Sequence, residues 1–318
     1  MPLLPSFRLL YEYILSFQTV RFGYQPRDKF KILINRVLYG SYPINLLWTQ
    51  KFEKPFIDPR VFVHDYRCGY RNLVFYCAGG NSEIQFLGRY EPSVKSIISR
   101  LDGGDAVDVG ANIGLYTMML SRVLADRGTV LSLEPDPHYF RLLQRNVRIN
   151  RGLNVALLDI AAWSENEELK LVRYRPGSSP IDTSVSPTDH ATARTVRGRP
   201  LDELIRESGI RPRLVKIDVE GAEYRVLSGM ETILRSVRPI VIFEALTTQA
   251  LAKCNPILHS AHYHVKALPD GNFLAAPEFE ATPEITPLNE PSARQVHSPH
   301  THEGRKLHRD RRFQSYDQ

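Results

Sequence analysis

The sequence predicts an α/β fold in which helices cover both faces of a mostly parallel sheet. From about residue 92 to residue 244, short runs of apolar, β-branched residues alternate with longer helical stretches. This alternation is typical of βαβ units, whose parallel strands are buried on both sides. The chain has 318 residues, of which 42% are hydrophobic and 24% charged, so a large core is expected and a wholly disordered or fibrous chain is excluded.

The expected strands and helices follow one another in a regular order. The strands are short apolar runs at residues 106–109, 129–134, 154–159, 214–219 and 239–244. The helices have apolar residues at three- and four-residue spacing and cover residues 93–101, 113–124, 138–149, 201–208 and 222–234. After a polar segment, residues 262–268 and 272–277 flank Pro269-Asp270-Gly271 and predict a C-terminal antiparallel hairpin.

The segments before and after this core are expected to form other structures. Residues 1–60 carry apolar runs between prolines and predict a helical N-terminal extension. The main domain is expected at residues 61–277, with its core at about 92–277. A small antiparallel meander opens it, with strands at residues 61–66, 72–77 and 83–87. Residues 278–318 are rich in Pro, Ser, His and Arg and predict a disordered tail, because they cannot bury enough apolar surface to offset their ordering entropy.

The charge and cysteine content of the chain bear on its partners and its cellular location. The 41 basic and 35 acidic residues give a net charge of +6, which is mild and gives no reason to expect nucleic acid. Three cysteines without zinc spacing predict neither a disulfide framework nor a zinc site, so a reducing, cytoplasmic location is the simplest interpretation. The apolar residues between 9 and 20 predict an amphipathic helix packed on the domain, with weak contact to a membrane surface as the alternative. The sequence predicts no oligomeric state.

The first strand is followed by a glycine loop. Ligands of open parallel sheets bind outside the carboxyl ends of the strands, so the residues of this loop are candidates for ligand binding. The loop contains Asp108, Gly110, Asn112 and Gly114, and its glycines allow a sharp turn and close approach of a ligand to the backbone. Asn112 replaces the second glycine of the GxGxxG fingerprint and Gly114 comes one place before the third, which argues against NAD or FAD. A plain strand-to-helix turn is the alternative without function.

The next two strand ends favour a nucleoside site. Glu134 follows the second strand, where a carboxylate can accept hydrogen bonds from both hydroxyls of a ribose. Glu134 could also be a surface residue, but the glycine loop upstream favours the nucleoside. After the third strand, Asp159 can meet an adenine edge, and Ala161 leaves room for the ring.

The fourth strand ends in a cluster of carboxylates. Asp218, Glu220 and Glu223 surround the start of the next helix, and Glu244 ends the following strand at the same edge. Helix N-termini favour negative charge, so a capping cluster is one interpretation. Asp218 and Glu220 are expected to lie over the same crevice as the nucleoside, and they are the candidate catalytic residues.

The segments DVGANIGLYT, LEPDP, LVKIDVEGAEYRVLSGM and RPIVIFE resemble the FkbM family of S-adenosylmethionine-dependent methyltransferases. The resemblance covers about residues 90–277 and implies the Rossmann-like class I methyltransferase fold. It implies that Asp108, Gly110, Asn112 and Gly114 hold the methionine part of the cofactor and that Glu134 holds the ribose. Members act mainly as O-methyltransferases on hydroxyls of sugars, glycolipids or polyketide-like products. The chain departs most from the family pattern around residues 165–195.

Methylation of an alcohol needs alignment with the methyl group and loss of the hydroxyl proton. Asp218 and Glu220 are the nearest expected bases. A divalent metal held by these residues and Glu244 is the competing route, and it is not favoured, because Glu244-Ala245 replaces the Asp-Asn pair of metal-dependent catechol-type methyltransferases. Two other classes remain as alternatives: a noncatalytic S-adenosylmethionine-binding scaffold and, less favoured, a nicotinamide-dependent oxidoreductase.

Overall fold

The computed structural model describes residues 17–39, 66–77, 85–86, 90–173, 192–245 and 247–278. The tail expected from residue 278 lies outside the described residues except for its first residue. Most of the amphipathic stretch expected at residues 9–20 also lies outside them. Where that stretch is described, at Phe17–Phe22, the chain forms the 3-10 helix η1.

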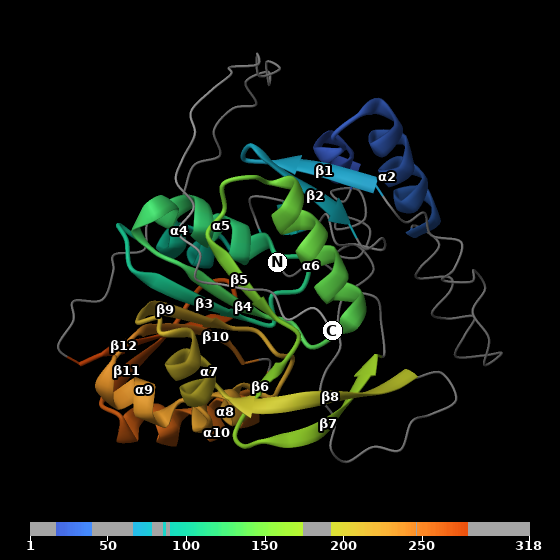
Figure 1. Ribbon diagram of the computed structural model, residues 1–318. Coiled ribbons are helices and arrows are strands. Elements are labelled where there is room, and N and C mark those ends of the chain that lie inside the picture. The colour runs from blue at the N-terminus through green and yellow to red at the C-terminus, as the bar shows by residue number, and fades with distance from the viewer. Residues whose placement is uncertain are drawn as a thin grey trace, which may run out of the picture. The chain divides into compact units, whose positions relative to one another are not determined.

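A seven-stranded sheet forms the centre of the fold, in the order β11-β12-β10-β9-β3-β4-β5 (Figure 1). Its parallel strands are β3 (Asp105–Val109), β4 (Val130–Leu133), β5 (Val155–Leu158), β9 (Pro212–Ile217) and β10 (Ile240–Glu244). Strands β11 (Tyr263–Ala267) and β12 (Asn272–Pro277) form the expected antiparallel hairpin, and β12 pairs antiparallel with β10. The prediction of a mostly parallel α/β sheet is therefore confirmed.

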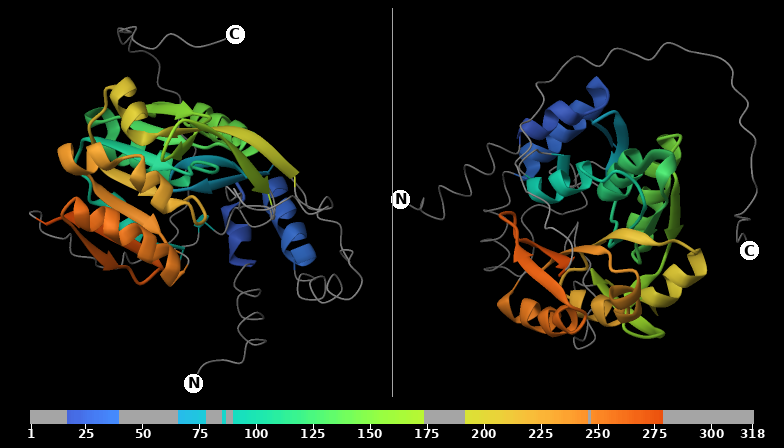
Figure 2. Two further views of the ribbon diagram at one scale, coloured as in Figure 1. Left: turned by 90° about the horizontal axis from the view of Figure 1, so that it is seen from below. Right: turned by 90° about the vertical axis from the view of Figure 1, so that its left-hand side faces the viewer.

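Helices cover both faces of this sheet (Figures 1 and 2). Alternate residues along a strand point to opposite faces, so Ala106 and Val107 of β3 belong to different cores. The core on the Ala106 side includes residues of α4 (Pro92–Ser99), α5 (Leu115–Leu124) and α6 (Pro137–Ile149). The core on the Val107 side includes residues of α7 (Leu201–Ser208), α8 (Glu223–Ser228), α9 (Glu231–Ser236) and α10 (Thr248–Ser260). A short 3-10 helix, η4 (Ala125–Arg127), follows α5.

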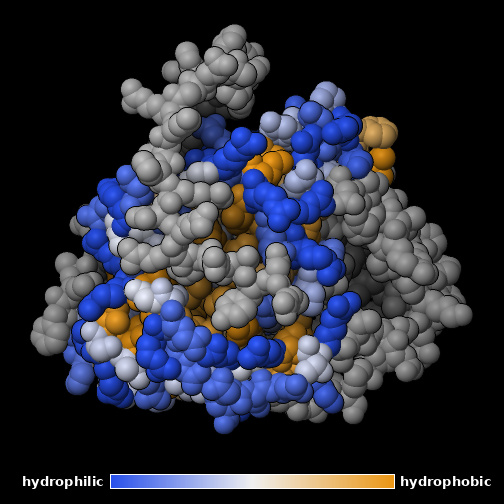
Figure 3. Space-filling model, viewed as in Figure 1, coloured by the Kyte–Doolittle hydropathy of each residue, from blue (hydrophilic) through white to orange (hydrophobic). Residues whose placement is uncertain are grey.

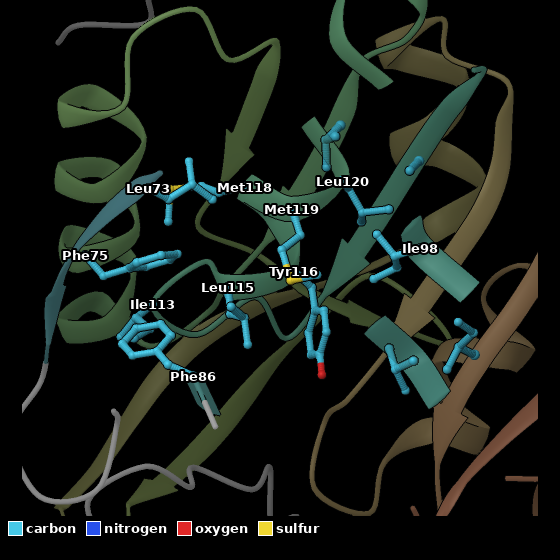
Figure 4. Close-up of a cluster of buried hydrophobic side chains, with 14 of the residues drawn as sticks. Leu73, Phe75, Phe86, Ile98, Ile113, Leu115, Tyr116, Met118, Met119 and Leu120 are labelled. Carbon is cyan, nitrogen blue, oxygen red and sulfur yellow. The ribbon is translucent and has the colours of Figure 1, made fainter. Parts of the chain in front are cut away.

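A hairpin and a helix precede the core. Strands β1 (Tyr66–Tyr70) and β2 (Leu73–Cys77) pair antiparallel, and α2 (Pro26–Tyr39) lies beside β1. Figure 4 shows Leu73 and Phe75 of β2 in one cluster with Ile113, Met118 and Phe86. The first strand was expected at residues 61–66, but of these only Tyr66 is described and it begins β1. The expected third strand is wrong at Gln85 and Phe86, which form a helical turn.

The helix expected at residues 222–234 is broken into α8 and α9 around Gly229. A Cβ built on Gly229 would lie 1.9 Å from the carbonyl oxygen of Trp163, so this segment is pressed against another strand. The Asp202 side chain accepts hydrogen bonds from the backbone N–H groups of Thr232 and Ile233, at 2.9 Å each. These tertiary contacts start a new helix where the apolar spacing predicts a continuous one.

Two further elements were not predicted. Helix α10 occupies the segment expected to be polar, and it is capped by Thr247, whose hydroxyl accepts from the N–H of Ala250 at 3.0 Å. A small second sheet, in the order β6-β8-β7, contains β6 (Ala161–Trp163), β7 (Glu167–Arg173) and β8 (Thr192–Pro200). Within the region that departs from the family pattern, β7 and β8 pair over seven residues and bury Leu169, Leu171 and Val196.

Candidate functional site

A cavity lies at the carboxyl ends of the parallel strands, at the point where the order of the strands reverses between β3 and β9. This is the position at which open α/β sheets bind ligands. Its wall combines the loops after β3, β4, β5, β9 and β10 with residues that precede α4. The polar residues that line it are Gln85, Tyr90, Asn112, Tyr116, Glu134, Tyr139, Lys216, Asp218, Glu220 and Glu244.

The glycine loop forms one wall of the cavity. Gly110 has a φ of +79°, and a Cβ built on it would lie 1.9 Å from the carbonyl oxygen of Asp218. Glycine at this position therefore lets the loop after β3 approach the loop after β9. Asn112 also has a positive φ, +52°, and its side-chain oxygen accepts from the N–H of Ile113 at 2.8 Å. Asparagine tolerates this conformation better than most residues because its short side chain bonds locally.

Glu134 is buried at the end of β4 and bonded to the loop. Its Oε2 accepts from the N–H of Asn112 and its Oε1 from the N–H of Asp136, each at 2.8 Å. Burial raises the pKa of Glu134 to about 7. A carboxylate has about four acceptor sites, so each oxygen can still accept a bond from a ligand in the cavity. Asp136 itself caps α6, because its side chain accepts from the N–H of His138 at 2.8 Å.

Three of the expected cofactor residues do not line the cavity. Asp108 is buried and accepts from the Thr117 hydroxyl at 2.6 Å, and burial raises its pKa. Gly114, with a φ of +92°, starts α5, where a Cβ would lie 2.6 Å from a methyl carbon of Leu143. Asp159 is exposed. The cavity thus brings together four of the seven expected cofactor residues: Gly110, Asn112, Glu134 and Ala161.

Both expected catalytic residues line the cavity with a third carboxylate. Asp218 and Glu220 come from the loop after β9, and Glu244 from the end of β10. Burial raises the pKa of Glu220, which has a φ of +57°. Burial, followed by the nearby Asp218 and Glu220 carboxylates, raises the pKa of Glu244 to about 8. The cavity therefore holds acidic groups that can change protonation state near neutral pH.

This cluster contains a cation, Lys216, that was not predicted from the sequence. Lys216 is buried in β9, and its ammonium group lies 2.9 Å from Oδ2 of Asp218. Burial lowers the pKa of a lysine, but the carboxylates of Asp218, Glu91 and Asp108 outweigh that effect and raise it. A lysine within an otherwise apolar strand was the available signal, because such a charge is rarely buried unless it is paired.

A second polar group borders this cation. The ammonium group of Lys216 lies 4.6 Å from the ring centre of Tyr116, whose hydroxyl donates to a carboxylate oxygen of Glu91. Burial and then Glu91 raise the pKa of Tyr116, so its hydroxyl stays protonated as the donor. Segments far apart in the sequence therefore fix the polar side of the cavity.

In the described ranges, no three His, Cys, Asp or Glu residues are grouped so that they could hold a metal ion. None of the helices seen in those ranges combines the length and the apolar character needed to cross a bilayer.

This chain is similar to several proteins that are named as methyltransferases. The hexuronic acid methyltransferase AglP of Haloferax volcanii is 31% identical over 140 residues, covering 42% of this chain and 53% of that protein. Methyltransferase 1 of Beauveria bassiana is 27% identical over 151 residues, covering 41% of this chain and 59% of that protein. This chain thus spans between about half and three fifths of the length of these relatives. Among solved structures, a methyltransferase FkbM from Methylobacillus flagellatus aligns with a TM-score of 0.42 and 22% identity, over 55% of this chain and 44% of that one.

The family described as methyltransferase FkbM domain matches residues 108–270. The matched segment is just over half of the chain. It contains the glycine loop, Glu134 and the carboxylates after β9 and β10. The chain therefore belongs to the methyltransferase FkbM domain family.

Proposed function

We propose that this protein is an S-adenosylmethionine-dependent methyltransferase that methylates a hydroxyl of a sugar, glycolipid or other small-molecule acceptor. The observation that carries the proposal is that a single cavity joins the Gly110–Asn112 loop and Glu134 to the carboxylates of Asp218, Glu220 and Glu244. Family membership supports the reaction class. The name of the Haloferax relative, a hexuronic acid methyltransferase, supports a sugar as the acceptor.

The residues of the cavity fit the cofactor. Glu134 has acceptor capacity for the ribose hydroxyls, and the backbone at Gly110 presents no side chain to the ligand. Ala161 and Ala162 are small lining residues that leave room for a flat ring. The bound cofactor supplies an electrophilic methyl group on a sulfonium. The carboxylates in the wall complement this positive charge.

We propose that a carboxylate of this cluster accepts the proton that the acceptor hydroxyl loses. Lys216 holds one oxygen of Asp218 at 2.9 Å, which fixes its position and leaves the other oxygen for an acceptor hydroxyl. Glu220 and Glu244 have pKa values raised by burial, and that of Glu244, about 8, suits proton transfer near neutral pH. Asp218 and Glu220 remain the proposed catalytic residues, and we propose Glu244 as a third because it lines the same cavity.

Calorimetry with S-adenosylmethionine, S-adenosylhomocysteine and NADH tests the cofactor first. The proposal expects both adenosyl ligands to bind and NADH not to bind. Binding of NADH alone would instead indicate a nicotinamide-dependent oxidoreductase. Mass spectrometry of glycans and lipids from cells that lack the gene, compared with wild type, would then identify the acceptor through the loss of a single methyl group. A protein that binds the cofactor but methylates no such compound would be a noncatalytic scaffold.

Three conservative substitutions then separate the carboxylates. Asp218→Asn, Glu220→Gln and Glu244→Gln retain shape but remove basicity, and loss of the general base is expected to lower kcat by about 10²–10⁴-fold. Affinity for S-adenosylhomocysteine, measured in the same variants, should change little. Near-normal turnover in all three would make the cluster structural. Loss of wild-type activity in EDTA, with recovery in Mg²⁺, would favour metal ligation over a direct base.

We propose a reducing, cytoplasmic location as well. The support is cysteine chemistry: Cys68, Cys77 and Cys254 are buried and form no disulfide among the described residues. Fractionation of cells with an antibody to the protein would test this.

A further inference from the structure

Helix α2, the β1–β2 hairpin and α6 form a continuous layer on one side of the core (Figure 1). Asp28 of α2 accepts from the backbone N–H of Arg67 in β1 at 3.1 Å. On the other edge of the hairpin, the side chains of Asn146 in α6 and of its C-cap residue Asn150 accept from the N–H groups of Tyr76 and Val74, at 2.6 and 2.8 Å. Side-chain hydrogen bonds therefore join the two helices to opposite edges of the hairpin.

One side of this layer faces the protein and the other faces solvent. Ile32 of α2, Phe75 of β2 and Leu142 of α6 are buried in the same core. All three elements also carry basic side chains that are exposed to solvent. They are Arg27, Lys29, Arg71, Arg141, Arg145 and Arg148.

The charged residues of this layer are almost all basic. The layer's segments, residues 26–39, 66–77 and 137–149, contain nine Arg and Lys residues and one acidic residue, Asp28. Asp28 is buried and bonded to backbone N–H groups, so it adds no exposed acid to the surface. The whole chain has 41 basic and 35 acidic residues, so the positive excess of these segments exceeds that of the complete protein.

Exposed apolar side chains occur on the same layer. The large hydrophobic residues that are exposed in the described parts of the chain are Tyr24, Phe30, Leu33 and Ile149. Phe30 is 62% exposed, and it lies one helical turn from both Leu33 and Arg27. Figure 3 shows hydrophobic side chains beside hydrophilic ones over α2, at the upper right. Helices that combine basic side chains with exposed Phe and Leu are typical of proteins that bind a membrane surface.

We propose that the solvent-facing side of the α2–hairpin–α6 layer docks on an anionic lipid surface. Arginine and lysine side chains attract the phosphate groups of anionic lipids, and aromatic and aliphatic side chains insert at the boundary between headgroups and acyl chains. A nucleic acid would use the same charges, but it offers no apolar phase for Phe30 and Leu33. The combination of charge and exposed aliphatic surface therefore favours lipid. This proposal concerns residues outside the cavity and does not depend on the proposed reaction.

Sedimentation with vesicles tests the proposal on the full-length protein. We expect binding to phosphatidylcholine vesicles that contain about 30% phosphatidylglycerol at about 0.1 M salt, and little binding to phosphatidylcholine alone. Arg141→Gln/Arg148→Gln removes two charges, each contributing about fivefold, and should lower the partition coefficient about 25-fold. Lys170→Gln/Arg197→Gln, at exposed positions of β7 and β8, is the matched control and should bind like wild type.

Insertion is tested separately through Phe30. In Phe30→Trp, tryptophan emission should shift to shorter wavelength when anionic vesicles are added, by more than the wild-type change. The residue is largely exposed, so the variant is expected to fold, and thermal unfolding checks this. Three results would overturn the proposal: no binding to anionic vesicles, equal losses in the α6 variant and its control, or an RNA oligomer that displaces the protein from vesicles at a lower phosphate concentration than the lipid.

Discussion

Glu134 offers a direct test of the cofactor site, because its contacts separate a ligand role from a structural one. Each carboxylate oxygen accepts one backbone N–H bond and can accept one more from the cavity. Glu134→Gln retains one acceptor oxygen and turns an NH₂ group toward the place of the other. At least one charge-assisted hydrogen bond to the cofactor is then lost, worth about 1.5–3 kcal/mol, or about 10- to 150-fold in affinity.

Titration calorimetry with S-adenosylhomocysteine at pH 8 measures this loss, because the carboxylate is ionised above its pKa of about 7. Asp159→Asn is the matched control, since this acid also follows a strand but is exposed and lies outside the cavity wall. A Glu134→Gln variant that is folded and binds within about twofold of wild type would remove Glu134 from the site, since even the weakest charged hydrogen bond predicts more.

The pH dependence of S-adenosylhomocysteine affinity tests the role of Glu134 independently. Burial raises the pKa of Glu134 to about 7, so the carboxyl group is protonated in the free protein below pH 7. Proton binding competes with the ribose hydroxyls, because a protonated carboxyl loses one acceptor. Wild-type affinity should therefore be highest above pH 7 and fall as the pH drops below it. The dependence should be nearly flat in Glu134→Gln, and an equally steep profile there would assign the titration to another group.

Three further predictions concern the fold. Gly110→Ala should lower the Tm by much more than Gly221→Ala does. Both positions have a positive φ, but only at Gly110 would the added Cβ meet backbone, at 1.9 Å from the carbonyl oxygen of Asp218. Equal shifts of the two variants in thermal unfolding would contradict this. Asp202→Ala removes both side-chain acceptors at the start of α9 and should lower the free energy of unfolding by about 1–2 kcal/mol in urea titrations, while a change within error would show that solvent replaces the cap. Removal of residues 280–318 should leave the Tm nearly unchanged, as their composition predicts few native contacts, and a fall of several degrees would show that they dock.

The order of strands and helices in the core could be predicted from local patterns. Parallel strands buried on both faces are continuous apolar runs, and β3, β4, β9 and β10 lie within a residue or two of their predicted positions. The glycine loop could be predicted as well, since a chain that turns at a strand end with positive φ favours Gly110 and Asn112. The rule that ligands bind at the carboxyl ends of parallel strands predicted Glu134 and Asp218, which line the cavity.

The sequence determined which strand ends carry candidate site residues, because a strand of apolar residues ending in a glycine or a carboxylate is a local pattern. Only the tertiary structure decided which of these residues share a cavity: Glu134 lines it, whereas Asp108 is buried behind it and Asp159 faces solvent. Only the tertiary structure paired Lys216 with Asp218 and broke the helix at Gly229. The physical reason is that packing between distant segments outweighs the preferences of a short stretch of chain, and the distance between two side chains is a property of the folded protein.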